Sequence, residues 1–289
     1  MIGWYLRHFI LKKKMIRLKF KKNKKISRDK VELFILGAQK CGTTSLHYYL
    51  DQHPSFQGSI PKETDFFSFD GLYEMGLNKY HTFFRNNNKN KVIRFDSSTE
   101  YLYIPYCAER IKQYNPKSKF IIIKRDPVKR AISAYKMYKS LSEGKLWSKE
   151  YKRKVIQYNN VYGDKMIDFL KRKPFPEFID IVKEEYEILL KTKEFIYEPS
   201  FIARGNYEQQ LNRFLNFFPK ENILEIDFSR YSNQTISVLN EILEFMGIKD
   251  ELFDNSYDFS IQLKSKEALT INTSTQSDLS IMFESIYKN

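Results

Sequence analysis

Short apolar runs alternate with longer amphipathic stretches along this chain from residue 31 onward. The apolar runs predict strands at 31–36, 56–60, 92–95, 119–123 and 222–227. The amphipathic stretches predict helices at 44–52, 104–115, 127–140, 176–191, 206–217 and 233–246, with a last helix near 279–287. Strands and helices that alternate in this way are typical of a parallel sheet with helices on both faces. The pattern therefore predicts an α/β fold.

The same pattern predicts that residues 31–289 form a single domain. They contain no internal repeat and no Pro-, Gly- or Ser-rich linker that would divide them. Residues 136–200 show no clear strand and predict a helical excursion from the sheet. An apolar fraction of 42% is enough for a hydrophobic core in a chain of 289 residues.

The net charge of +14 belongs mainly to residues 1–30, a basic N-terminal tail. This tail contains 12 of the 49 Lys and Arg residues and 1 of the 35 acidic residues. Its lysines alternate with apolar side chains, which leaves two interpretations open. One is a solvated lead-in, and the other is a segment that binds an anionic membrane surface. Nucleic acid is not an expected partner, because no nucleic-acid-binding module accompanies the tail.

Three other features of the sequence bear on the cellular compartment of the protein. No stretch approaches the ~18 uncharged apolar residues of a membrane span. Arg7 and His8 interrupt the apolar start, and no cleavage site of small residues follows, so we expect no signal peptide. The two cysteines, Cys41 and Cys107, cannot build a disulfide framework. These features predict a cytoplasmic protein, peripheral at the inner membrane if the tail binds lipid.

The first candidate anion site is the turn at residues 37–45, between a predicted strand and a predicted helix. Unpaired N–H groups and the helix dipole point at the same spot there. Thr43 stands where the phosphate loop of nucleoside triphosphatases carries Lys, and Lys40 precedes Gly42 by two residues. No Asp suited to magnesium ends a neighbouring strand, so we expect a phosphate-like group bound without metal. The candidate ligands are Lys40, Cys41, Gly42, Thr43, Thr44 and Ser45.

The second candidate anion site follows the predicted strand 119–123. Asp126 and Pro127 suit the cap and first turn of a helix that begins after Arg125. Arg125 and Ser133, roughly two turns further on, would together clamp a phosphate monoester. The alternative is a capped surface helix without a ligand. Lys129 and Arg130 are expected at the surface in either case.

Together the two turns resemble the nucleotide-binding segments of sulfotransferases that use 3′-phosphoadenosine 5′-phosphosulfate (PAPS). The closest likeness is to the carbohydrate group typified by heparan sulfate sulfotransferases. Residues 61–67, 98–102 and 205–224 resemble further family segments in the same order. The resemblance implies a phosphate-loop-like parallel sheet, with the 5′-phosphosulfate at 37–45 and the 3′-phosphate at Arg125 and Ser133.

The resemblance also implies catalytic roles. Glu63 matches the family's proposed general base, and Lys62 beside it would help to hold the sulfuryl group or the acceptor. Lys40 would stabilise the bridging oxygen as its bond to sulfur breaks. Lys264 is a candidate third contact to the 3′-phosphate, although the glycine of the family's loop is missing. Asp65 stands where the family often has His, which hints at a different acceptor.

Other residues leave alternatives open. The segment 98–102 either lines an acceptor cleft or starts a helix. We expect His47 and His53 to be structural. No group of His, Cys and Asp residues has metal-ligand spacing, so no metal is expected.

The sequence thus predicts transfer of a sulfuryl group from PAPS to a hydroxyl or amine of a glycan or glycolipid. The near-neutral charge of residues 31–289 argues against a long, highly sulfated polyanion as acceptor. Two other functions stay possible on this basis. One is a nucleotide kinase or triphosphatase with a degenerate phosphate loop, and the other is a membrane-associated nucleotide-binding protein without chemistry.

Overall fold

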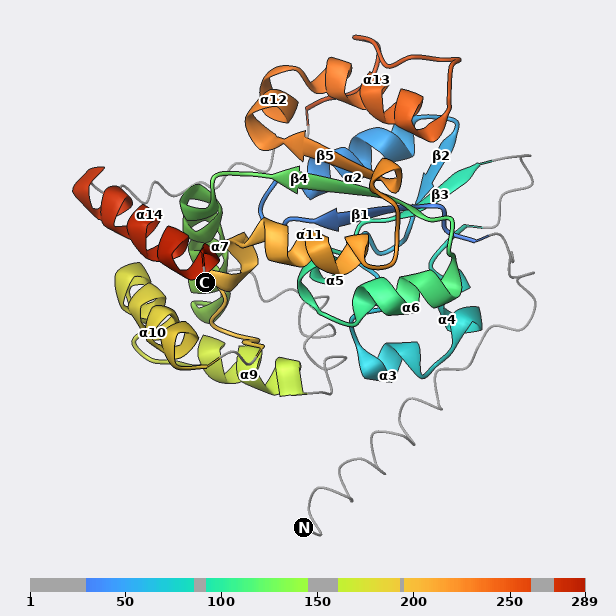
Figure 1. Cartoon of the computed structure of the whole chain (residues 1–289). Coiled ribbons are helices and arrows are strands. Elements are labelled where there is room, and N and C mark those ends of the chain that lie inside the picture. Colours follow the sequence, from blue (N-terminus) through green and yellow to red (C-terminus); the bar gives the residue numbers. More distant parts are fainter. Residues whose placement is uncertain (1–29, 86–91, 145–160, 193–194, 261–272, 289) are drawn as a thin grey trace.

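A single parallel sheet of five strands forms the centre of the molecule. The computed structural model describes residues 30–85, 92–144, 161–192, 195–260 and 273–288 (Figure 1). The strand order is β2-β3-β1-β4-β5, and every pairing is parallel. The strands are β1 (Leu33–Gly37), β2 (Phe56–Gly58), β3 (Ile93–Asp96), β4 (Lys119–Lys124) and β5 (Ile223–Asp227). Since β1 and β4 are neighbours, the turns that follow them open at the same edge of the sheet.

The two central strands are buried because both of their faces are covered. Leu33, Phe34, Ile35 and Leu36 of β1 are all 0% exposed. In the β1–β4 register Phe34 lies opposite Phe120, and their rings stack with centroids 5.9 Å apart. Strands of a parallel sheet that are covered on both faces consist of continuous apolar runs. This explains why both strands could be predicted from their sequences.

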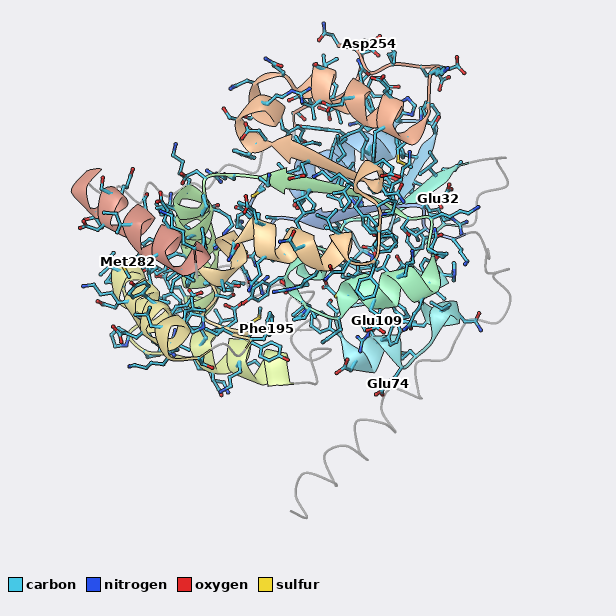
Figure 2. All side chains as sticks on the ribbon, viewed as in Figure 1. Glu32, Glu74, Glu109, Phe195, Asp254 and Met282 are labelled. Carbon is cyan, nitrogen blue, oxygen red and sulfur yellow. The ribbon has the colours of Figure 1, made fainter. Side chains whose placement is uncertain are left out.

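Helices cover both faces of the sheet (Figure 1). One face carries α2 (Thr43–Gln52), α12 (Phe228–Asn233) and α13 (Thr235–Met246). The other face carries α5 (Glu100–Tyr103), α6 (Cys107–Tyr114) and α11 (Tyr207–Leu215), with the short helices α3 (Asp70–Tyr73) and α4 (Leu77–His81) beyond them. A 3₁₀ turn, η2 (Lys220–Asn222), leads into β5. Side chains fill the space between these layers (Figure 2).

A helical lobe lies beside the carboxyl ends of the central strands (Figure 1). It consists of α7 (Pro127–Ser142), α9 (Val161–Leu170), α10 (Phe178–Lys191), η1 (Ala203–Gly205) and α14 (Thr273–Tyr287). Aromatic side chains join its parts: the ring of Tyr138 on α7 lies 5.6 Å from Phe169 of α9 and 5.7 Å from Phe201.

Across the described ranges, no helix has both the length and the apolar character needed to cross a membrane.

The predicted strands are all present, with ends that differ by one or two residues. The prediction of one helix over 104–115 is wrong at its start, because Pro105 intervenes between α5 and α6. Ile104 is extended (φ −73°, ψ 122°), as expected for a residue before proline. The predicted helix 233–246 is also preceded by a separate helix, α12, which begins where the Asp227 carboxylate accepts a hydrogen bond from the backbone N–H of Arg230.

Candidate active site

The turn after β1 has a shape that depends on glycine. The N–H of Ala38 donates to the carbonyl of Ile123 (3.0 Å), which ties the turn to the end of β4. Lys40 and Gly42 adopt left-handed backbone conformations (φ 69° and 81°). A Cβ atom at Gly42 would lie 3.1 Å from the ring of Tyr231, which would have to shift. Both the backbone conformation and the approach of Tyr231 therefore favour glycine at this position.

The N-terminus of α2 leaves backbone donors available. Gly42 is its N-cap and supplies no side-chain hydrogen bond, and the N–H of Leu46 donates to the carbonyl of Gly42 (3.1 Å). The N–H groups of Thr43, Thr44 and Ser45 therefore have no partner within the helix. The Ser45 hydroxyl donates to the Gly42 carbonyl (2.8 Å) and lies 3.1 Å from the hydroxyl of Tyr231. The turn can thus offer an anion several N–H groups at the positive end of a helix.

Lys62 connects Glu63 to this turn. Its Nζ donates to Glu63 Oε1 (2.8 Å) and lies 3.4 Å from Thr43 Oγ1 and 3.3 Å from the carbonyl of Ser97. The side chains of Lys62 and Glu63 are 18% and 29% exposed, so both remain accessible to a ligand. The structure therefore brings the two residues predicted from the 61–67 segment to the predicted phosphate turn.

A buried hydrogen-bond network centred on Asp96 holds the backbone beyond Glu63. Ser98 Oγ accepts from the N–H groups of Thr64 (2.9 Å) and Asp65 (3.0 Å) and donates to Asp96 Oδ1 (2.6 Å). Burial raises the pKa of Asp96, and its hydrogen bonds act in the opposite direction. Tyr101 donates to the same carboxylate (2.9 Å). The network fixes the turn that carries Glu63.

Burial around this network decides between the two alternatives for 98–102 and shows that Asp65 is enclosed. Ser98 is 0% exposed and Leu102 is 1% exposed, so 98–102 is a helix start and does not line an open cleft. Asp65 is 3% exposed, so its side chain is not presented to an acceptor. His53 is structural, as predicted: its Nδ1 accepts from the N–H of Ser55 (3.2 Å), and its ring lies against Phe253.

Lys40 and Arg125 join the two predicted anion sites. The guanidinium of Arg125 donates from Nη1 to the carbonyl of Lys40 (3.2 Å) and lies 4.6 Å from the centroid of the Phe228 ring. Burial lowers the pKa of Lys40, and the charges of Lys62 and Arg125 lower it further, whereas the Glu63 carboxylate raises it. These four charged groups therefore belong to one electrostatic environment.

The helix after Arg125 begins as predicted. The Asp126 carboxylate accepts from the N–H of Lys129 (2.7 Å), and Pro127 is the first residue of α7. Ser133 is half-buried further along this helix. The Arg125 backbone thus lies at the end of β4, while Ser133 comes from a helix of the lobe.

The expectation that Arg130 lies at the surface is wrong. Its side chain is 0% exposed, with Nη1 3.4 Å from Gln39 Oε1 and Nη2 donating to the carbonyl of Phe201 (2.6 Å). Arg130 shares a face of α7 with Ala134 and Tyr138. The rest of the helical lobe and the turn at 37–45 cover this face, and all three residues are buried. Lys129, one residue earlier, points away from this face and is exposed.

Two further predicted ligands, Cys41 and Lys264, and the histidine His47 complete the set of residues singled out in the sequence. Cys41 is buried, and burial raises the pKa of its thiol to about 11. Its backbone N–H already donates to the carbonyl of Ala38 (3.1 Å), so Cys41 offers an anion neither a thiolate nor a free N–H group. Lys264 lies outside the described residues. His47 contacts Ser97 Oγ through Nδ1 (2.9 Å), and burial lowers its pKa to about 4. His47 is therefore neutral near pH 7.

Sequence reasoning missed the aromatic residues of α12. Phe228 stacks on Arg125, and Tyr231 covers Gly42 and reaches Ser45. They lie about 100 residues or more from their partners, and no local pattern distinguishes them from core aromatics. The capped helix start at Asp227 was the available signal, since it showed that a helix begins at the edge of the sheet where β5 ends.

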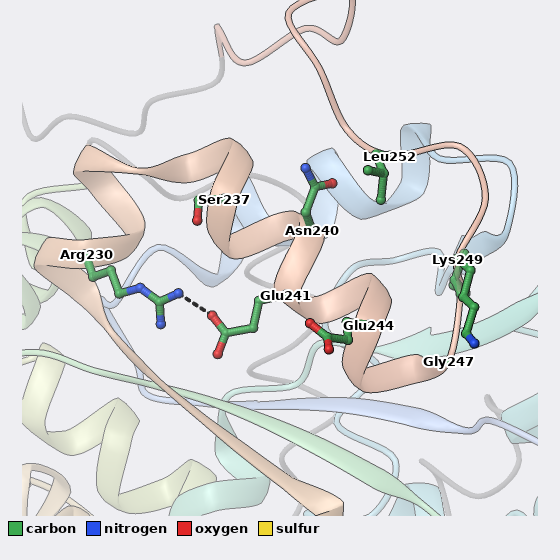
Figure 3. A pocket seen from close by; sticks show the side chains of 9 residues that line it. Arg230, Ser237, Asn240, Glu241, Glu244, Gly247, Lys249 and Leu252 are labelled. Atoms are coloured by element: carbon green, nitrogen blue, oxygen red, sulfur yellow. Dashed lines mark hydrogen bonds and ion pairs between the residues drawn. The ribbon is translucent and has the colours of Figure 1, made fainter.

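A separate hollow lies along α13, on elements other than the two turns (Figure 3). Arg230 and Glu241 form an ion pair there (2.5 Å), beside Glu244 and Lys249. The predicted ligands contribute none of its lining. Within the described ranges, His, Cys, Asp and Glu residues form no group of three that could hold a metal ion.

Comparisons with known proteins point in one direction. Residues 30–285 match the family model of the sulfotransferase domain. The membrane-associated sulfotransferase kil1 of Dictyostelium discoideum is 26% identical over 74% of this chain. The bifunctional heparan sulfate N-deacetylase/N-sulfotransferase 2 of Homo sapiens is 23% identical over 75% of it. A solved sulfotransferase from Alicyclobacillus acidocaldarius has a similar fold, with a TM-score of 0.62 and 24% identity over 89% of this chain and 93% of that chain.

The two sequence relatives are longer proteins. The aligned part covers 55% of the Dictyostelium protein and 22% of the human protein.

Proposed function

Since the chain belongs to the sulfotransferase domain family, we propose that it transfers a sulfuryl group from PAPS to a hydroxyl or amine of a glycan or glycolipid. The observation that carries this proposal is the position of Lys62, whose ammonium contacts both the Glu63 carboxylate and the Thr43 hydroxyl. This contact joins a carboxylate that can accept a proton to a turn that can bind a phosphate.

The residues present fit a donor with phosphates at both ends. Lys40, Lys62 and Arg125 supply positive charge, and the first turn of α2 supplies N–H groups. In this proposal the turn 40–45 holds the 5′-phosphosulfate, and Arg125 with Ser133 holds the 3′-phosphate. When bound, the donor supplies the sulfuryl group and a phosphate as leaving group.

Each catalytic residue then has a distinct task. Glu63 accepts the proton of the acceptor hydroxyl or amine, and the Lys62 ammonium at 2.8 Å favours the ionised carboxylate that this requires. Lys40 places positive charge where negative charge develops on the leaving oxygen. The hydrogen bonds that the N–H groups of Thr64 and Asp65 donate to Ser98 Oγ hold the backbone next to Glu63, which keeps the base in position for an in-line approach.

The acceptor class is supported by the relatives. The human relative carries heparan sulfate in its name, and the Dictyostelium relative is described as membrane-associated. These names favour a glycan or glycolipid. The acceptor can be identified by transfer of radiolabelled sulfate from PAPS to glycan and lipid extracts of the cells that make the protein. Each extract is tested before and after glycosidase digestion. Label that is insensitive to digestion would contradict a glycan acceptor.

Calorimetry tests the donor. We expect adenosine 3′,5′-bisphosphate to bind in the presence of EDTA, and adenosine 5′-monophosphate, which lacks the 3′-phosphate, to bind more weakly. The kinase alternative predicts the reverse pattern, with binding and turnover of ATP that require magnesium. Tight magnesium-dependent ATP binding without bisphosphate binding would overturn the proposed function.

A further inference from the structure

Arg130 is a fully buried cation in contact with the phosphate turn. Its Nη1 reaches Gln39 Oε1 and its Nη2 donates to the carbonyl of Phe201. Its Nε is also buried, and within the described part of the chain it has no hydrogen-bond acceptor. Both hydrogen-bond acceptors of the guanidinium are neutral, and no carboxylate of the described residues forms an ion pair with it.

Arg204, on η1 of the same lobe, provides a contrast. It is 3% exposed and donates to both oxygens of Glu100 (3.2 and 3.0 Å) and to Glu198 (3.3 Å). Of the two buried arginines in the described part of the lobe, only Arg204 is therefore neutralised by carboxylates. A buried charge without such a partner is expensive unless something else supplies the opposite charge.

Tyr138 and Gln39 connect these two arginines to the turn. The Gln39 amide donates from Nε2 to the Tyr138 hydroxyl (3.4 Å), which in turn donates to Glu198 (2.8 Å). Gln39 is thus held by Arg130 at its oxygen and by Tyr138 at its nitrogen. Since Gln39 immediately precedes Lys40, this clamp fixes the direction in which the turn presents its donors.

We propose that Arg130 is a positioning residue for the anionic donor, and that the charge it lacks in the protein is supplied by the phosphates bound at the adjacent turn. It acts through the Gln39 amide and through its field, without touching the reacting atoms. The charge of Arg130 also lowers the pKa of Lys40, which places both groups in the same field. This inference rests on the proposed function, because the ligand is the phosphate-bearing nucleotide.

The test uses Arg130→Gln, which removes the charge but keeps a donor for Phe201 or Gln39. We expect the ligand-free variant to have a melting temperature no lower than that of the wild type, because an uncompensated charge is removed. We expect the dissociation constant for adenosine 3′,5′-bisphosphate to rise at least about tenfold. Arg130→Lys, which keeps the charge, should retain affinity within about threefold.

Two controls separate this role from a structural one. Lys129→Gln removes the same charge from an exposed position on α7 and should leave both quantities nearly unchanged. Arg204→Gln removes a buried guanidinium that is paired, so it leaves two carboxylates unbalanced and should lower the melting temperature clearly.

The outcomes are distinguishable. If the wild type does not bind the bisphosphate, the proposed function fails. If the wild type and Arg130→Gln bind it equally, only this inference fails. A variant that does not fold, or a Lys variant that is as stable as the wild type yet loses as much affinity as the Gln variant, would also overturn the inference.

Discussion

Glu63 lies near the predicted phosphate turn because its sequence neighbours form hydrogen bonds there. Lys62 contacts Thr43, while the N–H groups of Thr64 and Asp65 both donate to Ser98. The motif at 61–67 identified Lys62 and Glu63 as candidate catalytic residues. Their meeting with the turn at 37–45 depends on the adjacency of β1 and β3, which the alternation of strands and helices alone does not specify.

Glu63→Gln tests the proposed base. The variant keeps the shape of the side chain but removes its ability to accept a proton, so we expect kcat to fall by about 10²–10⁴-fold. Binding of adenosine 3′,5′-bisphosphate, measured by calorimetry, should stay within the wild-type range. Glu74→Gln, at an exposed position beside α3, is the matched control. Normal turnover of the Glu63 variant would place the base elsewhere.

Lys40 should determine the alkaline limb of the pH–rate profile. Burial lowers its pKa from 10.5, so the lysine loses its charge, and transfer slows, at a lower pH than for an ordinary lysine. Lys40→Arg keeps the charge at every accessible pH. We expect this variant to be slower, with an alkaline limb shifted to higher pH. Superimposable alkaline limbs in the two proteins would exclude Lys40 as the titrating group.

His47 should make the free energy of unfolding depend on pH below about 6.5. Its pKa is lowered to about 4 from 6.5, so the unfolded chain binds more protons between these values and stability falls as pH falls from 6.5 toward 4. Between pH 7 and 5 the wild type should lose up to about 2 kcal/mol more unfolding free energy than His47→Gln. Urea unfolding at both pH values measures this, and equal losses in the two proteins would contradict it.

At the scale of elements, strands were predictable and helix starts were less so. The runs of β1 and β4 are buried on both faces, and continuous burial leaves a clear apolar pattern. The start of α6 was misplaced because Pro105 acts on Ile104 inside an otherwise helical pattern. The short helices α3 and α4 escaped prediction, because each has at most five residues and so shows little periodicity.

The contact between α10 and the turn before η1 depends on Glu185. This buried carboxylate accepts hydrogen bonds from the N–H groups of Phe201 (2.5 Å), Ile202 (2.9 Å) and Ala203 (2.9 Å). Glu185→Ala leaves two buried donors and one half-buried donor unpaired, so we expect the unfolding free energy to fall by about 3 kcal/mol or more. Denaturant unfolding measures the change.

The control for this prediction is Glu187→Ala on the same helix. Glu187 is 61% exposed and pairs with Lys191, so its loss should change the unfolding free energy by less than about 0.5 kcal/mol. Equal effects of the two substitutions would show that Glu185 does not anchor the turn.

At the scale of the whole molecule, the prediction concerns the basic N-terminal tail, residues 1–30. We expect the full chain to sediment with vesicles that contain anionic phospholipid and to stay in solution with neutral phosphatidylcholine vesicles. Replacing Lys21, Lys22, Lys24 and Lys25 by Gln should weaken anionic-vesicle binding by up to about 4 kcal/mol, since each Lys contributes about 1 kcal/mol. Equal recovery of both proteins would favour the solvated lead-in.

The sequence by itself determined the α/β class, the strands and the sulfotransferase family, and it predicted the two candidate anion turns, because each depends on residues close together in the chain. Apolar runs, caps and glycine turns act over a few neighbours. The tertiary structure decided that Arg130 is buried, that Tyr231 covers Gly42, and that Lys62 joins Glu63 to Thr43. These facts depend on which distant segments the sheet order and the helical lobe bring into contact, and local propensity carries no record of that choice.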